Sequence, residues 1–481
     1  IFAHEVVLVG GACPRGAVYT RAREAATSPP RREPPSMSED DKAQDHRQVV
    51  AMLGGGRLRT LVLDLWQRTR LDWGFVSDRL SQVFRKQTWV GARERRLVSE
   101  TVYGLVRHVR RVDAALAVAR RGAAKAPRDD ERLIAYFVLE GGLDVETAAQ
   151  LAPTVDWRAV AGFDAGLARE RDVVKRVAIG CSLPDWLAAR LVRDHGPRAE
   201  AIARALGRRA PTTIRANRLR TTAAALAEAL AARGLHTTPC ALATDGLHVD
   251  TRTNLNALPE FLAGDFEAQD EGSQLLAELC GGERDLVVDL CAGAGGKTLA
   301  LAAQMGNRGR VLACDVDPRK LGELAKRARR AGVTTVETLH LDGGAWPDAL
   351  ERRRGQVARV LVDAPCSGVG ALRRHPEARW RLREADLADF AASQVAIAGK
   401  AAALLAPGGR MIYATCTLIA DENQAVVDAV ARARGLRIVP LAEAWDARAA
   451  AVATADGRFL TVDPDRHGTD GFFAAVLERP R

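Results

Sequence analysis

The N-terminal third of the chain carries apolar residues at helical spacing. The longest stripe repeats every three or four positions from Val102 to Leu116, which places its members on one face of a helix. The pattern persists from about residue 57 to about residue 175 and predicts a helical domain. Three basic residues lie off the stripe, at Arg107, Arg110 and Arg111. We expect them on an outward face, which would suit RNA phosphates but would equally suit plain solvent.

The first 56 residues lack this period. They include a Pro/Arg-rich stretch from Ser28 to Pro35 and a polar segment after Met37. A segment with so little apolar surface cannot offset the entropy lost on folding. We therefore expect residues 1–56 to be a disordered extension, part of which lies upstream of a more natural start at Met37.

A mixed pattern follows between residues 176 and 262. Pro211 leads into a strand-like run, an Ala/Leu helix spans 222–233, and short strands are expected near Leu235 and Leu247. This pattern predicts a small α+β module that binds RNA. Basic residues lie on or beside its first strand, at Arg215, Arg218 and Arg220. No aromatic pair of the kind that stacks on bases accompanies them.

From residue 263 to the end, short apolar runs alternate with helical stretches. The strand candidates are residues 286–290, 311–315, 336–341, 360–363, 411–415, 436–441 and 472–477. Runs that are apolar on both faces are typical of buried parallel strands, so we predict a doubly wound, Rossmann-like α/β domain. Ligands of such sheets bind at the carboxyl ends of the strands.

Composition narrows the choice of partners. The formal net charge of +10 suggests a polyanion, because Lys and Arg release counterions from phosphates, although a solvated basic surface would give the same total. No uncharged apolar run reaches the roughly 18 residues that a membrane span needs. The eight cysteines contain no CxxC pair, which predicts no metal site and no disulfide scaffold. We expect a cytoplasmic protein with free thiols, and a monomer because no heptad seam is present.

A glycine-rich turn lies between a predicted strand and a predicted helix, in the segment VVDLCAGAGGKT. Glycine lets the backbone approach a ligand closely. A dinucleotide loop starting at Gly293 would need glycine where Thr298 stands, and a Walker A loop would need glycine where Cys291 stands. Both phosphate-binding patterns miss by one residue, which favours a nucleoside without a pyrophosphate.

Acidic residues at the next strand ends support the nucleoside interpretation. Asp315 closes the following strand, where its carboxylate can accept both ribose hydroxyls. Asp342 follows the third strand and could contact an adenine amino group. A tight turn without a ligand is the alternative for the glycine loop taken alone.

Two further strand ends carry cysteines, in VLVDAPCSG and IYATCTL. Each of these two, Cys366 and Cys416, taken alone would more often be a small core residue. Together with Asp363 they suit methylation of cytosine at carbon 5, which becomes nucleophilic only after a thiolate adds at carbon 6. The carboxylate would hold the ring as charge builds on it, and a base must later remove the carbon 5 proton.

Five segments together resemble the NOL1/NOP2/Sun family of RNA cytosine-5 methyltransferases. They are FEAQDEGSQ, DLCAGAGGKT, DAPCSGVGALRRHPE, LAPGGRMIYATCT and HGTDGFFAA. The helical segment RRLVSETVYGLVRHVRRVD is similar to the NusB-like domain of bacterial family members that act on small-subunit rRNA. The resemblance covers about residue 57 to the end.

The resemblance implies a role for each motif. Cys416 would be the nucleophile, Cys366 would promote product release, and Asp363 would touch both ligands. S-adenosylmethionine would be the cofactor and 16S rRNA the substrate. The cofactor site would be lined by Cys291, Ala292, Gly293, Ala294, Gly295, Gly296, Lys297, Asp315, Asp342 and Asp363.

Three other functions remain open at this point. DNA cytosine-5 enzymes use a Pro-Cys thiolate, which would make Cys366 the nucleophile, but their Glu-Asn-Val element is here Glu422, Asn423 and Gln424. A tRNA cytosine-5 methyltransferase would carry the same motifs. A non-catalytic RNA-binding assembly factor would not need both cysteines.

Overall fold

The computed structural model describes residues 39–120, 126–251, 253–281 and 286–481, with side chains from residue 46 onward. The disorder expected for residues 1–38 lies outside these residues. The same expectation is wrong for the segment that follows, because Glu39–Gly54 form helix α1 and bury Met52 and Leu53 in a helical core. Val49 and Val50 pack against the same core, so the apolar end of a polar helix anchors it. No helix in the described part of the chain is long and apolar enough to cross a membrane.

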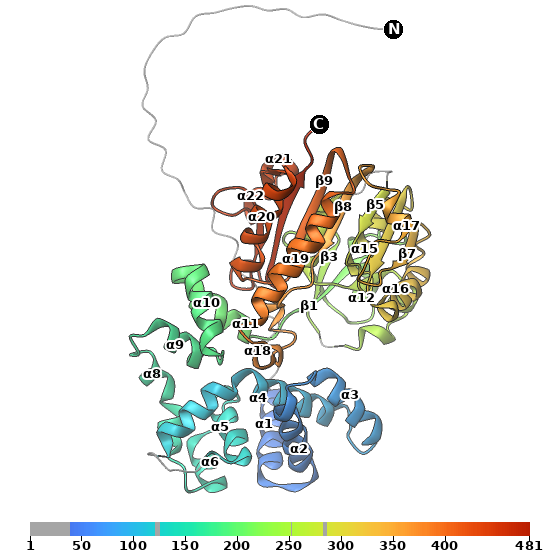
Figure 1. Cartoon of the computed structure of the whole chain (residues 1–481). Helices are drawn as coiled ribbons and strands as arrows, with labels where there is room; N and C mark the ends of the chain where they lie inside the picture. The colour runs from blue at the N-terminus through green and yellow to red at the C-terminus, as the bar shows by residue number, and fades with distance from the viewer. Residues whose placement is uncertain (1–38, 121–125, 252, 282–285) are drawn as a thin grey trace, which may run out of the picture. The chain divides into compact units, whose positions relative to one another are not determined.

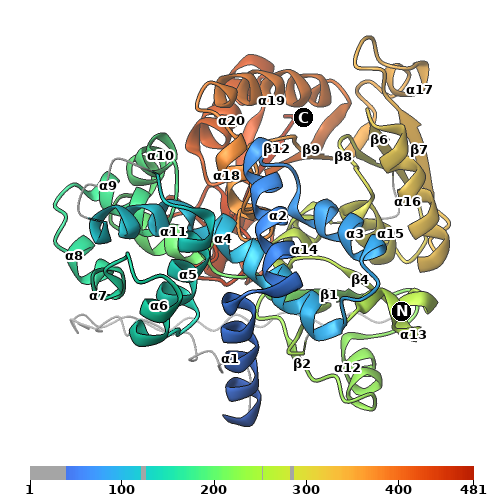
Figure 2. The same ribbon diagram turned by 90° about the horizontal axis from the view of Figure 1, so that it is seen from below.

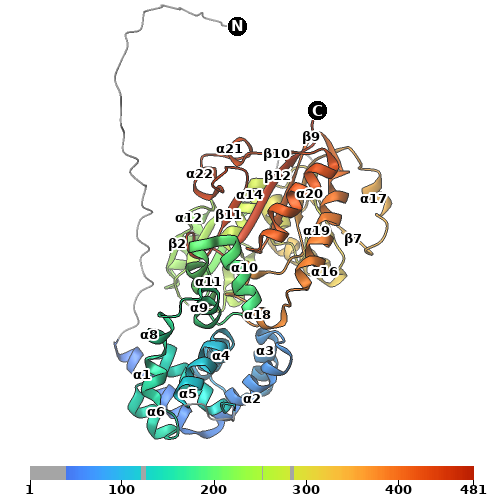
Figure 3. The ribbon, with the colours of Figure 1, turned by 60° about the vertical axis from the view of Figure 1, so that its left-hand side comes forward.

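A first group of helices packs around one apolar core (Figure 3). Its members are α1, α2 (Gly56–Asp72), α3 (Val76–Lys86), α4 (Ala92–Ala119), α5 (Asp129–Glu140), α6 (Val145–Leu151), α7 (Trp157–Ala161) and α8 (Phe163–Leu167). The predicted stripe on α4 is buried from Val102 to Leu116. This confirms the prediction that the N-terminal third is helical.

The expected outward basic face of α4 is wrong. Arg111 is only 8% exposed and pairs with acidic side chains of α5 and α8. Arg110 donates to the carbonyl oxygen of Leu183 at 2.6 Å, and Arg107 donates to that of Arg373 at 3.1 Å. The side of α4 opposite the stripe is therefore a second packed face, where guanidinium groups pair with backbone carbonyls and with carboxylates of neighbouring helices.

Three helices connect this group to the rest of the chain. They are α9 (Val173–Gly180), α10 (Asp185–His195) and α11 (Ala199–Gly207), with a short 3₁₀ turn at Gly196–Arg198. They lie side by side (Figure 2) and share one core with Leu372, Leu387 and Leu418 of the C-terminal region. The apolar spacing of Trp186, Leu187 and Leu191 predicts a helix here, which α10 confirms, and helical structure continues to Gly207.

A buried arginine completes this junction. Arg379, on α18 (Ala378–Arg381), is fully buried and donates to the carbonyl oxygens of Arg107, Cys181, Ser182 and Leu206 at 3.3 to 3.4 Å. Burial lowers the pKa of Arg379 to about 9. Carbonyl dipoles take the place of a carboxylate partner for this cation.

The small module contains a four-stranded antiparallel sheet. Its strands are β1 (Thr212–Ala216), β2 (Thr237–Pro239), β3 (Gly246–Val249) and β4 (Phe266–Ala268), in the order β2-β3-β1-β4, with helices α12 (Ala223–Ala231) and α13 (Pro259–Ala263). Strand β4 was expected to open the C-terminal domain but pairs with β1 instead. Its register with Ile214 to Ala216 gives the small sheet its fourth strand.

The arginines of this module do not form a free basic edge. Arg215 is 4% exposed and donates to Gln269, Arg218 pairs with Asp245, and Arg220 donates to a backbone carbonyl. Burial lowers the pKa of Arg215 to about 10. The strand ends at Ala216, so the later arginines lie in a turn.

The C-terminal region is built on an eight-stranded sheet. Its strands are β5 (Leu286–Asp289), β6 (Arg310–Asp315), β7 (Val336–His340), β8 (Val357–Asp363), β9 (Leu405–Thr415), β10 (Arg437–Val439), β11 (Leu460–Val462) and β12 (Phe472–Glu478). The order is β10-β12-β9-β8-β5-β6-β7, with β11 beside β12. Strands β5 to β9 run parallel, whereas β12 is antiparallel to β9, β10 and β11. The predicted α/β domain is confirmed, with β11 as an unpredicted strand.

Helices cover both faces of this sheet (Figure 1). One face packs against α14 (Glu271–Cys280), α15 (Gly296–Gln304) and α16 (Pro318–Ala331), and the other against α17 (Asp348–Glu351), α19 (Asp386–Ala402) and α20 (Gln424–Arg434). Two short helices, α21 (Leu441–Ala444) and α22 (Ala449–Val452), join the first face. Successive strand residues alternate between the faces, as Val287 and Val288 do on β5. Both faces are buried, which explains the apolar runs in the sequence.

Candidate active site

The glycine loop runs from the end of β5 into α15. Gly293 and Gly295 adopt positive φ angles of 55° and 88°. A Cβ on Gly295 would lie 2.6 Å from Leu324, whereas one on Gly293 would meet nothing within 4 Å. Asp315, at the end of β6, accepts a hydrogen bond from the Gly293 amide at 2.7 Å. The loop is thus fixed on its inner side and leaves open space on its outer side.

The other expected loop residues surround this turn. The Ala292 amide donates to the Cys314 carbonyl at 2.9 Å, and the Ala294 carbonyl accepts from Arg327 at 2.6 Å. Cys291 is half-buried, and burial together with nearby carboxylates raises the pKa of its thiol. A thiol that keeps its proton here acts as a packing residue.

Lys297 and Asp363 meet where the strand order reverses, between β5 and β8. The Lys297 Nζ lies 2.6 Å from an Asp363 carboxylate oxygen. Burial opposes the charge on Lys297, but Asp363 and then Cys416 raise its pKa above the usual value. A fixed ammonium therefore lies within electrostatic reach of both the carboxylate and the thiol. This is the position at which doubly wound sheets bind ligands.

Asp342 follows β7, the edge strand of the parallel part of the sheet. It is exposed in the loop after β7 and accepts from the Gly344 amide at 2.9 Å. The structure shows no contact between Asp342 and the glycine loop.

The two motif cysteines are brought together from adjacent strand ends. The Cys366 and Cys416 sulfurs lie 3.4 Å apart, after β8 and β9 respectively. The hydrogen bond to Cys416, together with burial, raises the pKa of Cys366 well above its usual value. Cys366 therefore resists losing its proton while the two sulfurs are in contact.

A buried carboxylate that the sequence did not single out as functional holds the Cys366 loop. Glu422 accepts from the Ser367 amide at 2.8 Å, from the Ser367 hydroxyl and from Gln394 at 2.9 Å. The Gly370 amide also donates to the Cys416 carbonyl at 2.9 Å. The sequence drew attention to Glu422 only through its failure to match the DNA-enzyme element. The only hint in the sequence was that Glu422 lies a few residues after Cys416.

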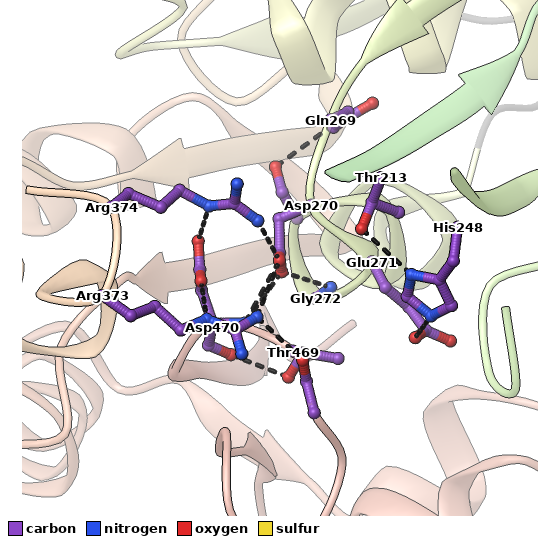
Figure 4. A network of polar contacts seen from close by, with 12 residues as sticks. Thr213, His248, Gln269, Asp270, Glu271, Gly272, Arg373, Arg374, Thr469 and Asp470 are labelled. Atoms are coloured by element: carbon purple, nitrogen blue, oxygen red, sulfur yellow. Dashed lines mark hydrogen bonds and ion pairs between the residues drawn. The ribbon is translucent and has the colours of Figure 1, made fainter. Parts of the chain in front are cut away.

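Three of the family-like motifs meet in one charged network (Figure 4). Asp270 and Asp470 are buried carboxylates, and Arg373 and Arg374 each pair with both of them. Burial and the neighbouring Asp470 raise the pKa of Asp270. The Asp470 amide also donates to Asp270, and the next amide, of Gly471, donates to the Gly370 carbonyl at 2.9 Å. The network thus anchors the segment that follows Cys366.

Comparisons with known proteins agree with this geometry. One family model, described as 16S rRNA methyltransferase RsmB/F, matches residues 277–478. A second, described as an RsmF/B-like methyltransferase ferredoxin-like domain, matches residues 183–256. The second match identifies the small antiparallel sheet and its helices as a ferredoxin-like domain.

Individual relatives cover most of the chain. The chain is 31% identical over 406 residues to ribosomal RNA small subunit methyltransferase B of Xanthomonas campestris, a match covering 80% of this chain and 89% of the relative. It is 32% identical to the human 28S rRNA (cytosine(4447)-C(5))-methyltransferase, over 63% of this chain and 39% of that protein. The crystal structure of the protein PH0851 shares the fold, with a TM-score of 0.69, 23% identity and coverage of 88% of this chain and 99% of that one.

Proposed function

The chain belongs to the RsmB/F (Sun/NOP2) family of S-adenosylmethionine-dependent rRNA methyltransferases, and we propose that it methylates carbon 5 of a cytosine in 16S rRNA. The observation that carries the proposal is the 3.4 Å separation of the Cys366 and Cys416 sulfurs. Methylation at carbon 5 needs a nucleophile that adds to carbon 6 and a base that later removes the proton from carbon 5. Two adjacent thiols can supply both groups.

The residues around the glycine loop fit a nucleoside cofactor. The open side of Gly293 and the Asp315 carboxylate would hold the ribose, with Asp342 toward the base and Lys297 and Asp363 toward the reacting end. When bound there, S-adenosylmethionine supplies an electrophilic methyl group.

Cys416 is the proposed nucleophile. Its thiolate sulfur forms a bond to cytosine carbon 6, and the ring electron pair moves to carbon 5, which becomes the methyl acceptor. The Asp363 carboxylate accepts a hydrogen bond from the exocyclic amine and so orients the ring. Lys297 keeps the Asp363 carboxylate in place, and its ammonium lies within electrostatic reach of Cys416. The DNA-enzyme arrangement, with Cys366 as nucleophile, is disfavoured because the contact with Cys416 and burial raise the pKa of Cys366.

Cys366 is the proposed acceptor of the carbon 5 proton. Once the Cys416 sulfur is bonded to the ring it carries no charge, so the hydrogen bond that raises the pKa of Cys366 no longer does so. Cys366 then releases its proton to solvent and removes the proton from carbon 5. The electron pair reforms the ring double bond, the carbon-sulfur bond breaks, and Cys416 leaves as a thiolate.

The helical and ferredoxin-like segments are proposed to orient the RNA. A hollow of about 580 Å³ between α4, α9 and α11 is lined by six arginines: Arg107, Arg111, Arg176, Arg204, Arg208 and Arg209. Three carboxylates, Glu140, Asp164 and Glu200, line the same hollow and reduce its net charge. We propose that the helical domain of α1 to α8 and the small domain of β1 to β4 bind the RNA, and that the C-terminal α/β domain is catalytic.

Trapping of the covalent intermediate tests this function. Cys366→Ala should add to the ring and accept the methyl group but fail to release, so a protein-RNA adduct should accumulate. Cys416→Ala and the double variant should form no adduct. Each variant is incubated with S-adenosylmethionine and undermethylated 16S rRNA, and a retarded, ribonuclease-sensitive band is sought on a denaturing gel. Cys181→Ala, which alters a buried cysteine outside the site, is the matched control.

Three outcomes would contradict the proposal. A band with Cys416→Ala that is lost with Cys366→Ala would reverse the two roles. Methyl transfer to tRNA but not to 16S rRNA would move the substrate to the tRNA class, and the absence of transfer to any RNA would favour a non-catalytic assembly factor.

A further inference from the structure

A cluster of three side chains of the kinds that bind metal ions lies on the ferredoxin-like domain. Cys240 follows β2, His248 is on β3, and Glu271 is the first residue of α14. One ligand atom from each lies within 4.8 Å of the other two. The His248 Nε2 is 3.7 Å from the Cys240 sulfur and 3.6 Å from a Glu271 oxygen. Tetrahedral zinc, with bonds of about 2.3 Å to sulfur and about 2.0–2.2 Å to nitrogen or oxygen, places its ligands roughly 3.4–3.6 Å apart.

Neighbouring groups orient two of these ligands. The Thr213 hydroxyl lies 3.2 Å from the His248 Nδ1, which leaves Nε2 directed toward the cluster. One Glu271 oxygen accepts from the Leu242 and Ala243 amides at 2.6 and 3.1 Å, and the other faces His248. Figure 4 shows the imidazole of His248 between Thr213 and Glu271. Partners of this kind, which fix the ring and the carboxylate, are typical of metal sites.

An unpartnered polar atom lies beside the same cluster. The Gln274 side-chain oxygen has no hydrogen-bond partner in the described structure, although Gln274 is only 1% exposed. A Cβ on Gly246 would lie 2.6 Å from the Cys240 sulfur and 3.1 Å from this oxygen. Glycine thus leaves room between the two atoms. A water molecule on a bound ion could donate to the Gln274 oxygen, which would otherwise stay unsatisfied.

We propose that Cys240, His248 and Glu271 bind one zinc ion, with water as the fourth ligand. The donor set of one thiolate, one imidazole and one carboxylate is of the type that zinc prefers. The sequence predicted no metal site because the ligands are not in a CxxC pair and come from three separate elements. Glu271 is adjacent to Asp270 of the charged network, so the ion ties the ferredoxin-like sheet to the start of α14.

Metal binding by the full-length chain tests the proposal. The catalytic cysteines are first replaced by alanine, at 366 and 416, so that they cannot bind zinc themselves. Equilibrium dialysis against Zn²⁺ with elemental analysis should then give one ion per chain. Cys240→Ser and His248→Gln should lose it, whereas His340→Gln, an exposed histidine at the end of β7, should keep it. Thr213→Val should weaken zinc binding by about 10- to 100-fold.

Cobalt(II) provides a second readout that does not depend on stability. The Co²⁺-loaded chain should show a thiolate-to-cobalt charge-transfer band, which Cys240→Ser should abolish without altering the far-ultraviolet circular dichroism. Failure of the starting protein to take up Zn²⁺ would overturn the proposal and leave a His248–Glu271 ion pair only. Equal uptake by Thr213→Val, or an unchanged cobalt spectrum in Cys240→Ser, would overturn it as well.

Discussion

Asp289, the last residue of β5, should make the stability of the catalytic domain depend on pH. It is 1% exposed and accepts a hydrogen bond from Thr298 at 2.7 Å, while its other oxygen has no hydrogen-bond partner in the described structure. Burial raises the pKa of Asp289 from 3.8 to about 7, an effect that the Thr298 hydrogen bond only partly opposes. The folded protein therefore binds a proton that the unfolded chain releases between about pH 4 and pH 7, so stability should fall as pH rises through this window.

The magnitude follows from the two pKa values. A shift of roughly three units corresponds to about 4 kcal/mol across the whole window. Between pH 5 and pH 8 alone, linkage gives a loss of about 2.5 kcal/mol. Asp289→Asn, which cannot ionise and can still accept from Thr298, should not show this loss.

Urea unfolding, followed by circular dichroism at pH 5, 6, 7 and 8, measures the difference between the original protein and Asp289→Asn. Ionisation of other groups cancels in that difference, provided that they do not interact with Asp289. Asp348→Asn, at an exposed position, is the control and should follow the original protein at every pH. Parallel pH profiles for the original protein and Asp289→Asn would refute the assignment of a raised pKa.

Three further changes have expected outcomes. Asp315→Ala should weaken S-adenosylmethionine binding about tenfold to a hundredfold, because one charge-assisted hydrogen bond contributes about 1.5–3 kcal/mol. An unchanged affinity in calorimetry would show that Asp315 does not bind the cofactor. Asp470→Asn should lower the free energy of unfolding by about 3–5 kcal/mol by leaving buried arginines short of charge, whereas Asp348→Asn should change it by less than about 1 kcal/mol; equal melting temperatures would contradict this. Lys297→Met should slow alkylation of Cys416 by iodoacetamide about tenfold at neutral pH, because the nearby ammonium is gone. Mass spectrometry of the labelled peptide measures the rate, and an equal rate in both proteins would rule out an effect of Lys297 on the reactivity of Cys416.

The parallel sheet could be predicted because its signal is local. Strands such as β6 and β8 are buried on both faces, and that requirement leaves short apolar runs in the sequence. The cysteine pair could also be expected, since adjacent parallel strands end at one edge. The separation of 3.4 Å between the two sulfurs required the structure.

Charged residues were predicted least well. The sequence pattern distinguishes apolar from polar positions but not a solvated arginine from a buried one. The sequence pattern predicted that Arg111 and Arg215 lie at the surface. In the structure both are buried, and their guanidinium groups bind carboxylates and a glutamine from distant elements. The role of Glu422 was missed for the same reason, because its partner Ser367 is 55 positions away. Strand β4 was misassigned because three residues carry no information about which sheet they will join.

The buried Arg379 also constrains the order in which the chain can be completed during synthesis. The carbonyl groups that it satisfies belong to Arg107, Cys181, Ser182 and Leu206, which precede it by 272, 198, 197 and 173 residues. At about 5–20 residues per second, the ribosome delivers Arg379 roughly 10 to 50 s after those segments. The nascent helices must therefore remain soluble with these carbonyls hydrated and the adjoining apolar surface uncovered. A ribosome that stalls before residue 379 leaves this surface exposed to solvent.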